Sequence, residues 1–267
     1  MQNPPIQYRE YKPGPALQPF VECYWAGTPG PAGNGPEEFH RVVPDGCIDI
    51  LVEFDLSPGE TGGRVVPAFA DRTSVVGTMS RPLIVTPGPA ACFLGVRFKP
   101  GKAMGFLGAS AGELTDQSIP LTQFWGRESG CLEAQLTERH DIGTKLALLE
   151  TTLLGKLERK KDEDPYVEAL VGMILGRRGA VSIGALSQFA GISRQHVARK
   201  FDRHVGISPK LFCRIMRFQE LMRTIRLGSD TDWATTALEL GYYDQAHMIS
   251  EFKEFSGLTP TLFAVVG

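Results

Sequence analysis

A short pattern that occurs twice in the C-terminal part of this chain limits its fold more than any other feature. The first copy runs from Ala190 to Pro209 and the second from Leu240 to Pro260. Each copy has a Gly turn, then a Phe, then a Gly-x-Ser/Thr-Pro segment, and equivalent positions are 50 or 51 residues apart. This order predicts a short helix, a turn, a second helix and a stop, which is the layout of a helix-turn-helix. Two such units on one chain would reach two adjacent segments of the major groove of DNA.

The first unit carries the local signals that such a motif needs. Gly191 supplies the backbone freedom for the turn. Ser193 caps a second helix over residues 194–204, in which Val197 and Phe201 are four residues apart and face inward. Because Arg pairs with guanine and Gln with adenine, the polar positions of this helix are candidate DNA contacts. They are Arg194, Gln195, His196, Arg199, Lys200 and Arg203.

A long helix is predicted to connect the two units. Ser208 and Pro209 suit its first turn, and its apolar positions would be buried between the units. A continuous helix of this length is a stiff spacer of roughly 25 Å. In the second unit Asp244 caps the second helix, whose candidate DNA contacts are Gln245, His247 and Ser250.

Charge is distributed unevenly between the two units. The whole chain has a formal net charge of −2, yet residues 191–226 hold nine Lys and Arg against two acidic residues, a local +7. Such a concentration attracts phosphate groups. The second helix of the second unit instead sets Lys253 against Asp244, Glu251 and Glu254. The sequence therefore predicts that the first unit dominates DNA affinity.

The chain before residue 130 has a different sequence pattern, in which short apolar segments alternate with Pro-Gly and Asp-Gly turns. This pattern predicts strands, hence a β-rich sandwich or barrel. The segments are 20–25, 48–52, 74–77, 83–85 and 93–98. We expect an α+β multidomain protein: a β-rich domain ending in a helix pair (1–157), a charged linker (158–164), and an all-α domain (165–267). The two helix-turn-helix units would lie at about 183–205 and 233–255.

A leucine stripe closes the first domain. Leu146, Leu149, Leu153 and Leu157 lie on one face of a predicted helix. The stripe either packs onto its own β domain or forms a seam between two chains of a homodimer. It spans fewer than two heptads, too few to indicate a coiled coil.

The C-terminal pattern resembles a known family. The stretch 241–260, with Gly241-Tyr242-Tyr243-Asp244 at its start, resembles the signature segment of AraC/XylS-type transcription regulators, and 190–209 resembles that family's other helix-turn-helix. The resemblance covers about 165–263. It implies a seven-helix domain with two recognition helices in successive major-groove segments. The positions that it implies face bases are Gln195, Ala198, Arg199, Gln245, Ala246 and Ser250.

The N-terminal segments around 20–25, 43–47 and 95–101 are similar to an uncharacterised domain found ahead of such DNA-binding modules. That resemblance implies a sensing domain for an effector or a partner. Asp45-Gly46 beside Cys47 indicates either a tight turn or a ligand contact. Arg97, in an otherwise apolar strand, is either a paired structural cation or the anion anchor of an effector pocket. Arg97, Asp45 and Cys47 are thus the candidate effector contacts.

Other functional classes have weaker support in the sequence. Five scattered cysteines without C-x-x-C spacing favour a reducing cytoplasm over a disulfide framework. His40 and His140 lack the partners of a metal site, and we expect no cofactor, no catalytic triad and no membrane span. The alternative hypothesis is a DNA-binding module fused to a cysteine-based repair or redox enzyme, reacting through Cys47 or Cys23. Expected partners are double-stranded DNA, a small-molecule effector, and RNA polymerase if the protein is an activator.

Overall fold

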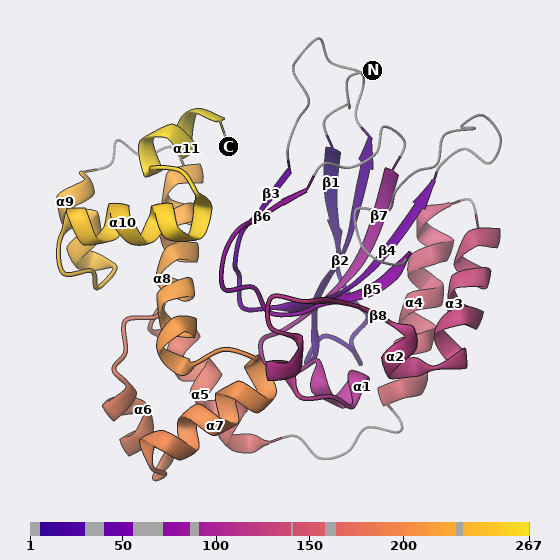
Figure 1. The fold of residues 1–267 in the computed structure, drawn as a ribbon, viewed down its shortest axis with the longest axis horizontal. Helices are drawn as coiled ribbons and strands as arrows, with labels where there is room; N and C mark the ends of the chain where they lie inside the picture. The colour runs from indigo at the N-terminus through magenta and orange to yellow at the C-terminus, as the bar shows by residue number, and fades with distance from the viewer. Residues whose placement is uncertain are drawn as a thin grey trace.

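The computed structural model describes residues 6–29, 40–55, 72–85, 91–139, 141–157, 164–227 and 232–266. Within these ranges a β-rich domain precedes an all-α domain, as the alternation of strand and helix patterns predicts. Figure 1 shows the sheet in the right half of the molecule and the helical domain at the left. His140 and residues 158–163 of the predicted linker lie outside the described residues.

The N-terminal domain is built on a six-stranded antiparallel sheet. Its strand order is β1 (Ile6–Tyr11), β2 (Val21–Pro29), β7 (Ala91–Phe98), β4 (Ile48–Asp55), β5 (Thr73–Val76) and β8 (Ser118–Pro120). A separate two-stranded ribbon pairs β3 (His40–Val42) with β6 (Leu83–Val85). The five predicted strands are confirmed as β2, β4, β5, β6 and β7, whereas β1, β3 and β8 had no clear signal in the sequence.

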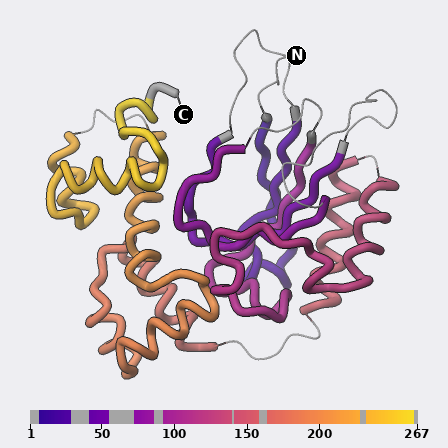
Figure 2. Tube along the Cα trace, viewed as in Figure 1, coloured from indigo at the N-terminus to yellow at the C-terminus, as the bar shows by residue number. Residues whose placement is uncertain are grey.

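The two faces of the sheet are covered differently, because successive strand residues point to opposite sides. On one face Ile50, Leu94 and Val96 join the main core of this domain. On the other face Leu51 and Phe93 form a small separate cluster with Trp25 and Val76 packed against it. This second face lies toward the β3/β6 ribbon, which the trace in Figure 2 shows between the sheet and the helical domain.

Helices cover the main core. Short helical segments α1 (Met104–Leu107), η1 (Ala111–Leu114, a 3-10 helix) and α2 (Thr122–Trp125) lead into the pair α3 (Arg127–Glu138) and α4 (Ile142–Leu157). Leu149 and Leu153 are almost completely buried in the β-domain core, and Leu146 and Leu157 pack against it. The first interpretation of the leucine stripe, packing onto its own domain, is therefore confirmed.

The helical domain contains seven described helices. They are α5 (Pro165–Gly176), α6 (Ile183–Ala190), α7 (Arg194–Val205), α8 (Pro209–Arg226), α9 (Trp233–Glu239), α10 (Gln245–Ser256) and α11 (Pro260–Val266). One core unites them, with Phe201 from α7, Phe218 from α8 and Phe252 from α10 fully buried. No described helix is long and apolar enough to cross a membrane.

Candidate nucleic-acid interface

The first helix-turn-helix consists of α6 and α7, joined at Gly191. Ser182 caps α6 by accepting a hydrogen bond from the backbone N–H of Ala185, 3.1 Å away. Gly191 has φ of +65°, the left-handed conformation that ends a helix and that favours glycine. Ser193 then accepts from the N–H of His196 at 3.2 Å and starts α7. The predicted caps and turn of this unit are confirmed.

The buried side of α7 fixes which side chains face solvent. Val197 and Phe201 are fully buried, four residues apart on one stripe. On the remaining surface Gln195, Ala198 and Arg199, at spacings of three and four, are exposed together. Arg194 and Arg203 are also exposed, and His196 is half-buried. The α7 positions that the family resemblance implies face bases therefore share one accessible face.

Lys200 differs from its neighbours on α7. Its ammonium forms an ion pair with Asp164, and it lies 4.8 Å from the centre of the Tyr166 ring. Burial acts in the opposite direction, but the paired ammonium still holds the pKa of Asp164 below its ordinary value. Asp164 also caps α5 by accepting from the N–H groups of Tyr166 and Val167. Lys200 thus connects α7 to the first turn of α5, where the helical domain begins.

The second helix-turn-helix consists of α9 and α10, joined at Gly241. Asp244 accepts a hydrogen bond from the N–H of His247 at 2.7 Å, which confirms the predicted cap. Met248, Phe252 and Phe255 are fully buried. The exposed positions at the start of α10 are Gln245, Ala246, His247 and Ser250. Both second helices therefore expose their N-terminal halves, where a helix attracts phosphate.

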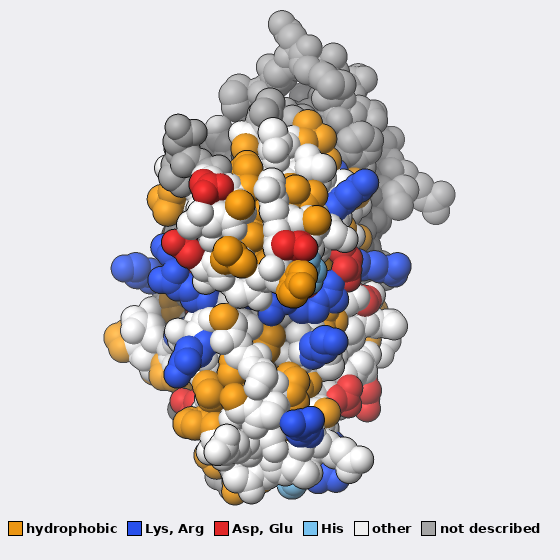
Figure 3. Space-filling view, turned by 90° about the vertical axis from the view of Figure 1, so that its left-hand side faces the viewer, with side chains coloured by type: hydrophobic (Ala, Val, Ile, Leu, Met, Phe, Trp, Pro, Cys, Tyr) orange, Lys and Arg blue, Asp and Glu red, His pale blue; other side chains and the backbone are white. Residues whose placement is uncertain are grey.

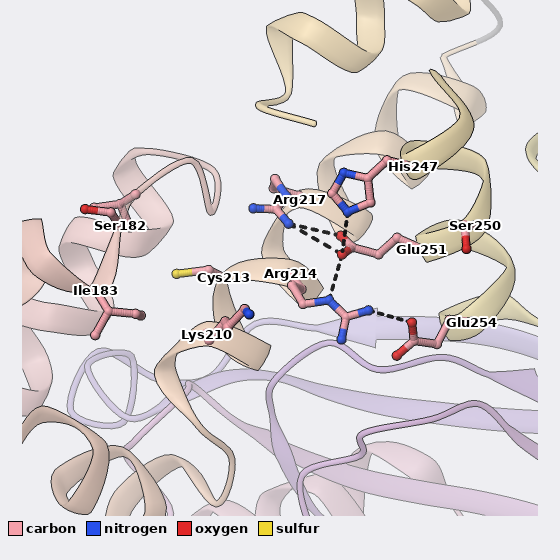
Figure 4. Close-up of a pocket in the computed structure, with 11 residues that line it drawn as sticks. Ser182, Ile183, Lys210, Cys213, Arg214, Arg217, His247, Ser250, Glu251 and Glu254 are labelled. Carbon is pink, nitrogen blue, oxygen red and sulfur yellow. Dashed lines mark hydrogen bonds and ion pairs between the residues drawn. The ribbon is translucent and has the colours of Figure 1, made fainter. Parts of the chain in front are cut away.

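A buried carboxylate joins the connecting helix to the second unit. Glu251 of α10 is 2% exposed and receives Arg214 at 2.7 Å and Arg217 at 3.3 Å, both from α8. Arg214 also reaches Glu254 at 2.6 Å, and the His247 ring lies 3.8 Å from Glu251. Figure 4 shows these side chains converging on Glu251 from the two helices.

These contacts line a groove of about 570 Å³ between the two units. Its walls come from the start of α6, the first half of α8 and the exposed side of α10. The lining residues are Val181, Ser182, Ile183, Lys210, Cys213, Arg214, Arg217, His247, Ser250, Glu251 and Glu254. His247 and Ser250, both candidate DNA contacts, thus border this groove from α10, opposite the start of α6.

The ion pairs change the charge balance that the sequence indicates. Arg214 and Arg217 belong to the positive segment 191–226, yet they neutralise Glu251 and Glu254 of the second unit. The excess positive charge of the first unit and connecting helix therefore partly cancels the excess negative charge of the second unit where α8 contacts α10. The two recognition helices differ less in the charge around them than their linear sequences indicate.

Both recognition helices present their N-terminal ends on one side of the molecule. Figure 1 shows α7 and α10 starting at the left and running toward the β domain, with α8 between them. Figure 3 views that left-hand side, where Lys and Arg side chains gather across the middle and lower part of the face. A helix of 18 residues, α8, separates the two units, about 27 Å at the rise of an α-helix.

The N-terminal domain contacts the opposite ends of the same two helices. Thr78 donates a hydrogen bond to the carbonyl of Val205 at 2.6 Å, and Thr115 donates to that of Gly206, at the end of α7. Arg41 on β3 donates to the carbonyl of Ser256, the last residue of α10, at 2.5 Å. Since the last carbonyls of a helix have no partner within the helix, these donors complete both C-termini.

Further contacts attach the connecting helix to the β domain. Gln219 of α8 donates to the carbonyl of Pro44 at 2.5 Å. Gly46 lies against α8 so closely that an added Cβ would be 2.5 Å from the Phe212 ring. The β domain thus contacts both recognition helices, α7 and α10, and also α8, the helix that sets the spacing between them.

The candidate effector residues lie in the N-terminal domain, around Arg97. The guanidinium makes two hydrogen bonds to Asp49, at 3.0 and 3.2 Å, and lies 3.3 Å from Asp45. Asp45 also accepts from the N–H of Cys47 at 2.9 Å, and Gly46 has φ of +78°, so a tight turn forms here. Arg97 is therefore a paired cation, the first of the two interpretations. Among the described residues no group of three or more His, Cys, Asp or Glu is placed to hold a metal ion.

Several contacts of the interface were absent from the sequence-based hypothesis. The buried pairing of Glu251 could have been found, because Glu251 is an acidic residue on the same stripe as Met248, Phe252 and Phe255. An acid on a buried stripe indicates a paired charge. Thr78 and Arg41, in contrast, carry no signal, since their partners are more than 100 residues away in the chain.

Comparison with known proteins agrees with this geometry. Residues 186–264 match the family described as "Helix-turn-helix domain", and residues 9–120 match "Domain of unknown function (DUF6597)". An "Uncharacterized HTH-type transcriptional regulator" of Haemophilus influenzae is 28% identical over 145 residues. The match covers 48% of this chain and 48% of that protein, so the chain spans about half the length of this relative.

Two solved structures are also similar to this chain. The C-terminal domain of AraT from Geobacillus stearothermophilus has 18% identity and a TM-score of 0.37, and covers 39% of this chain and 87% of that one. ToxT from Vibrio cholerae has 9% identity and a TM-score of 0.44, and covers 85% of this chain and 97% of that one.

The helices, caps and family match define the class of the C-terminal domain. It is a double helix-turn-helix domain of the AraC/XylS type. Residues 9–120, ahead of it, match a family that is defined without a function.

Proposed function

We propose that this protein is a sequence-specific DNA-binding transcription regulator, controlled through its N-terminal domain. The helices α7 and α10 enter two successive major-groove segments of one DNA site. Arg194, Gln195, Arg199 and Arg203 contact it from α7; Gln245, His247 and Ser250 contact it from α10. His196 and Lys200, the latter paired with Asp164, complete the proposed DNA contacts of α7.

One observation carries the proposal: both recognition helices expose their N-terminal halves on the same side of the molecule. Gln195 and Arg199 are four residues apart on α7, so both side chains would face the floor of the groove. Their donors and acceptors match the edges of adenine and guanine. Exposed arginines beside them would contact phosphate and fix the register.

Control of DNA binding by the N-terminal domain is supported by the hydrogen bonds that this domain donates to the two recognition helices. The hydrogen bonds from Thr78 and Arg41 end on the last turns of α7 and α10. A change in the β domain would therefore alter the relative position of the two helices. An effector bound there changes DNA affinity only if it favours one of these arrangements over the other.

The cysteine-enzyme alternative has little physical support at the two thiols that it requires. Burial raises the pKa of Cys23 to about 12, and burial together with the carboxylate of Asp45 raises that of Cys47. Since the thiolate is the reactive species, both thiols are poor nucleophiles near neutral pH. The cysteines form no disulfide in the part of the chain that the structure describes, which suits the reducing cytoplasm that we propose for this protein. The same proposal includes formation of a homodimer and, if the protein is an activator, contact with RNA polymerase.

The test is DNA binding by the full chain to a site found by footprinting on genomic fragments. Arg199→Ala should weaken binding to that site by about 1–3 kcal/mol and weaken binding to random DNA much less. Fluorescence anisotropy at several salt concentrations separates base contacts from phosphate contacts. Arg9→Ala, which removes an exposed arginine on β1, is the matched control and should leave affinity unchanged.

Equal losses on specific and random DNA would mean that Arg199 contacts phosphate and reads no base. Failure of the wild-type chain to select any sequence over random DNA would refute the proposed function itself.

A further inference from the structure

A cavity of about 160 Å³ lies in the N-terminal domain, between the second face of the sheet and the β3/β6 ribbon. Trp25, Leu51 and Phe93 line it from three adjacent strands of the sheet. Val42, Leu83 and Val85 line it from the ribbon. Its walls are therefore almost entirely apolar, and they belong to two separate sheets.

The floor of the cavity is an aromatic surface. Trp25 pairs with Gly95 on the neighbouring strand, where an added Cβ would be 2.1 Å from the indole ring. Because Gly95 has no side chain, the indole covers it. Tyr8, from the next strand, stacks on the indole with ring centres 5.7 Å apart. Stacked aromatic faces favour a flat or a cationic ligand.

One wall carries charge. Asp49 and Arg97 both line the cavity, and the Asp45 carboxylate, which does not line it, lies 3.3 Å from the guanidinium Nε. Two carboxylates against one guanidinium leave this wall with one excess negative charge when all three are ionised. Burial raises the pKa of Asp49 and the nearby Arg97 opposes this shift, so an additional positive charge beside the carboxylate would stabilise its ionised form. Arg97, in contrast, already donates to Asp49 through two of its nitrogens.

From these features we propose that the cavity binds a small single-ring molecule bearing an amine, with the ring on Trp25 and the amine directed at Asp49. The volume supports one ring, since an apolar cavity of about 150 Å³ holds benzene. A carboxylate ligand is disfavoured, because it would face Asp49 and would have to displace it from Arg97. This proposal rests on the proposed function and names the effector class of its sensing domain.

The ribbon connects this cavity to the DNA-binding helices. Val42 lines the cavity, and its neighbour Arg41 donates to the end of α10. Two residues further on, Pro44 accepts from Gln219 on α8. A ligand that moves the ribbon would therefore change the contacts that position α10.

The experiment is isothermal titration of the full chain, without DNA, using benzylamine, benzyl alcohol and benzoate. These probes share a ring and differ in charge. Benzylamine should bind about tenfold or more tightly than benzoate, with benzyl alcohol between them, since a like charge at the buried wall is strongly unfavourable. Benzoate binding as tightly as benzylamine, or no binding by any of the three, would overturn the proposal.

Three variants sharpen this result. Asp49→Asn keeps the shape of the wall and should abolish the preference for benzylamine, whereas the remote, exposed Glu138→Gln should preserve it. Leu83→Trp places a large ring at a partly exposed position of the cavity wall and should weaken all three probes. An undiminished benzylamine preference in Asp49→Asn, or unchanged binding in Leu83→Trp, would contradict the assigned site.

Anisotropy with DNA, run on the same samples, separates this proposal from the proposed function. Benzylamine binding without any DNA selectivity would refute the regulator and leave the cavity assignment intact. DNA selectivity without benzylamine binding would refute the cavity assignment alone.

Discussion

At the residue scale, Gly46 shows how one missing side chain lets two domains meet. Its φ of +78° closes the turn after Asp45, and its Cα faces the Phe212 ring of α8. A left-handed backbone alone costs a non-glycine residue about 1–2 kcal/mol. At this position the approach of α8 adds a second, steric requirement.

We therefore expect Gly46→Ala to lower the free energy of unfolding by more than the loss that backbone strain alone would cause. Gly108→Ala is the matched control, because Gly108 has φ of +71° with nothing within 4 Å of the added Cβ. Urea denaturation should give about 1–2 kcal/mol for Gly108→Ala and a clearly larger loss for Gly46→Ala. Equal losses would mean that α8 moves aside without cost.

A second expectation at this scale concerns the thiols. At pH 8 a thiol reagent should label the exposed Cys131 first and Cys23 and Cys47 slowly. Because burial raises the pKa of Cys23 to about 12, its labelling rate in the folded protein should rise about tenfold per pH unit from pH 8 to 10. The same thiols in urea-unfolded protein serve as the reference. Labelling of Cys23 or Cys47 in the folded protein at pH 8 as fast as in this reference would support the hypothesis of a cysteine-based enzyme.

At the element scale, α8 does more than separate the two helix-turn-helix units. Its apolar side enters the shared core, while Arg214 and Arg217 bind Glu251 on α10. A buried ion pair restricts both the distance and the relative orientation of the two helices that it joins. The reason is that the buried charges are compensated only while the geometry of the pair is kept. The ion pairs of Glu251 thus contribute to the angle between α8 and α10, together with the packing of Phe218 against Phe252 and Phe255.

Glu251→Gln should lower the free energy of unfolding by about 3 kcal/mol, since it leaves two arginines without their buried counter-charge. Glu254→Gln is the control: Glu254 pairs with Arg214 but is 54% exposed, so its loss should cost less than about 1 kcal/mol. Chemical denaturation of both variants measures the difference. Similar small losses for the two would show that water reaches Glu251 and screens it.

At the scale of the whole molecule, the β domain acts as a clamp on the DNA-binding domain. Thr78, Thr115 and Arg41 donate to the C-terminal carbonyls of the two recognition helices, whose other ends face away from the β domain. The clamp thus fixes the spacing of the proposed DNA-binding surface without covering it. Fixing that spacing in advance reduces the ordering cost when both helices bind one DNA site.

Thr78→Val should loosen this clamp at α7. The substitution keeps the shape of a fully buried side chain but leaves the carbonyl of Val205 without its donor, at a cost of about 1–3 kcal/mol in unfolding free energy. Affinity for a full DNA site should fall more than affinity for a site cut to one major-groove segment. Thr137→Val, which removes an exposed hydroxyl on α3, is the control and should change neither quantity. An equal loss on full and shortened sites would contradict the clamp.

Much of the helical domain could be predicted because its signals are local. Ser193 and Asp244 cap helices through their own next turns, and Gly191 ends a helix through its own φ. The strands that were predicted, such as β4 and β7, are apolar segments between turns. In contrast β1, with Tyr8 and Arg9 exposed, is a polar edge strand whose pairing with β2 no local pattern indicates.

The sequence by itself determined the repeat, the caps, the core stripes and hence two helix-turn-helix units joined by a long helix, because each of these depends on residues within a few turns of one another. Only the tertiary structure decided how the charges combine, what holds the recognition helices and where a cavity lies. Glu251 neutralises arginines 34 and 37 positions away, Arg41 reaches α10 across 215 positions, and the cavity forms between two separate sheets. Such contacts follow from packing of the whole chain, so linear charge counts and local periodicity carry no record of them.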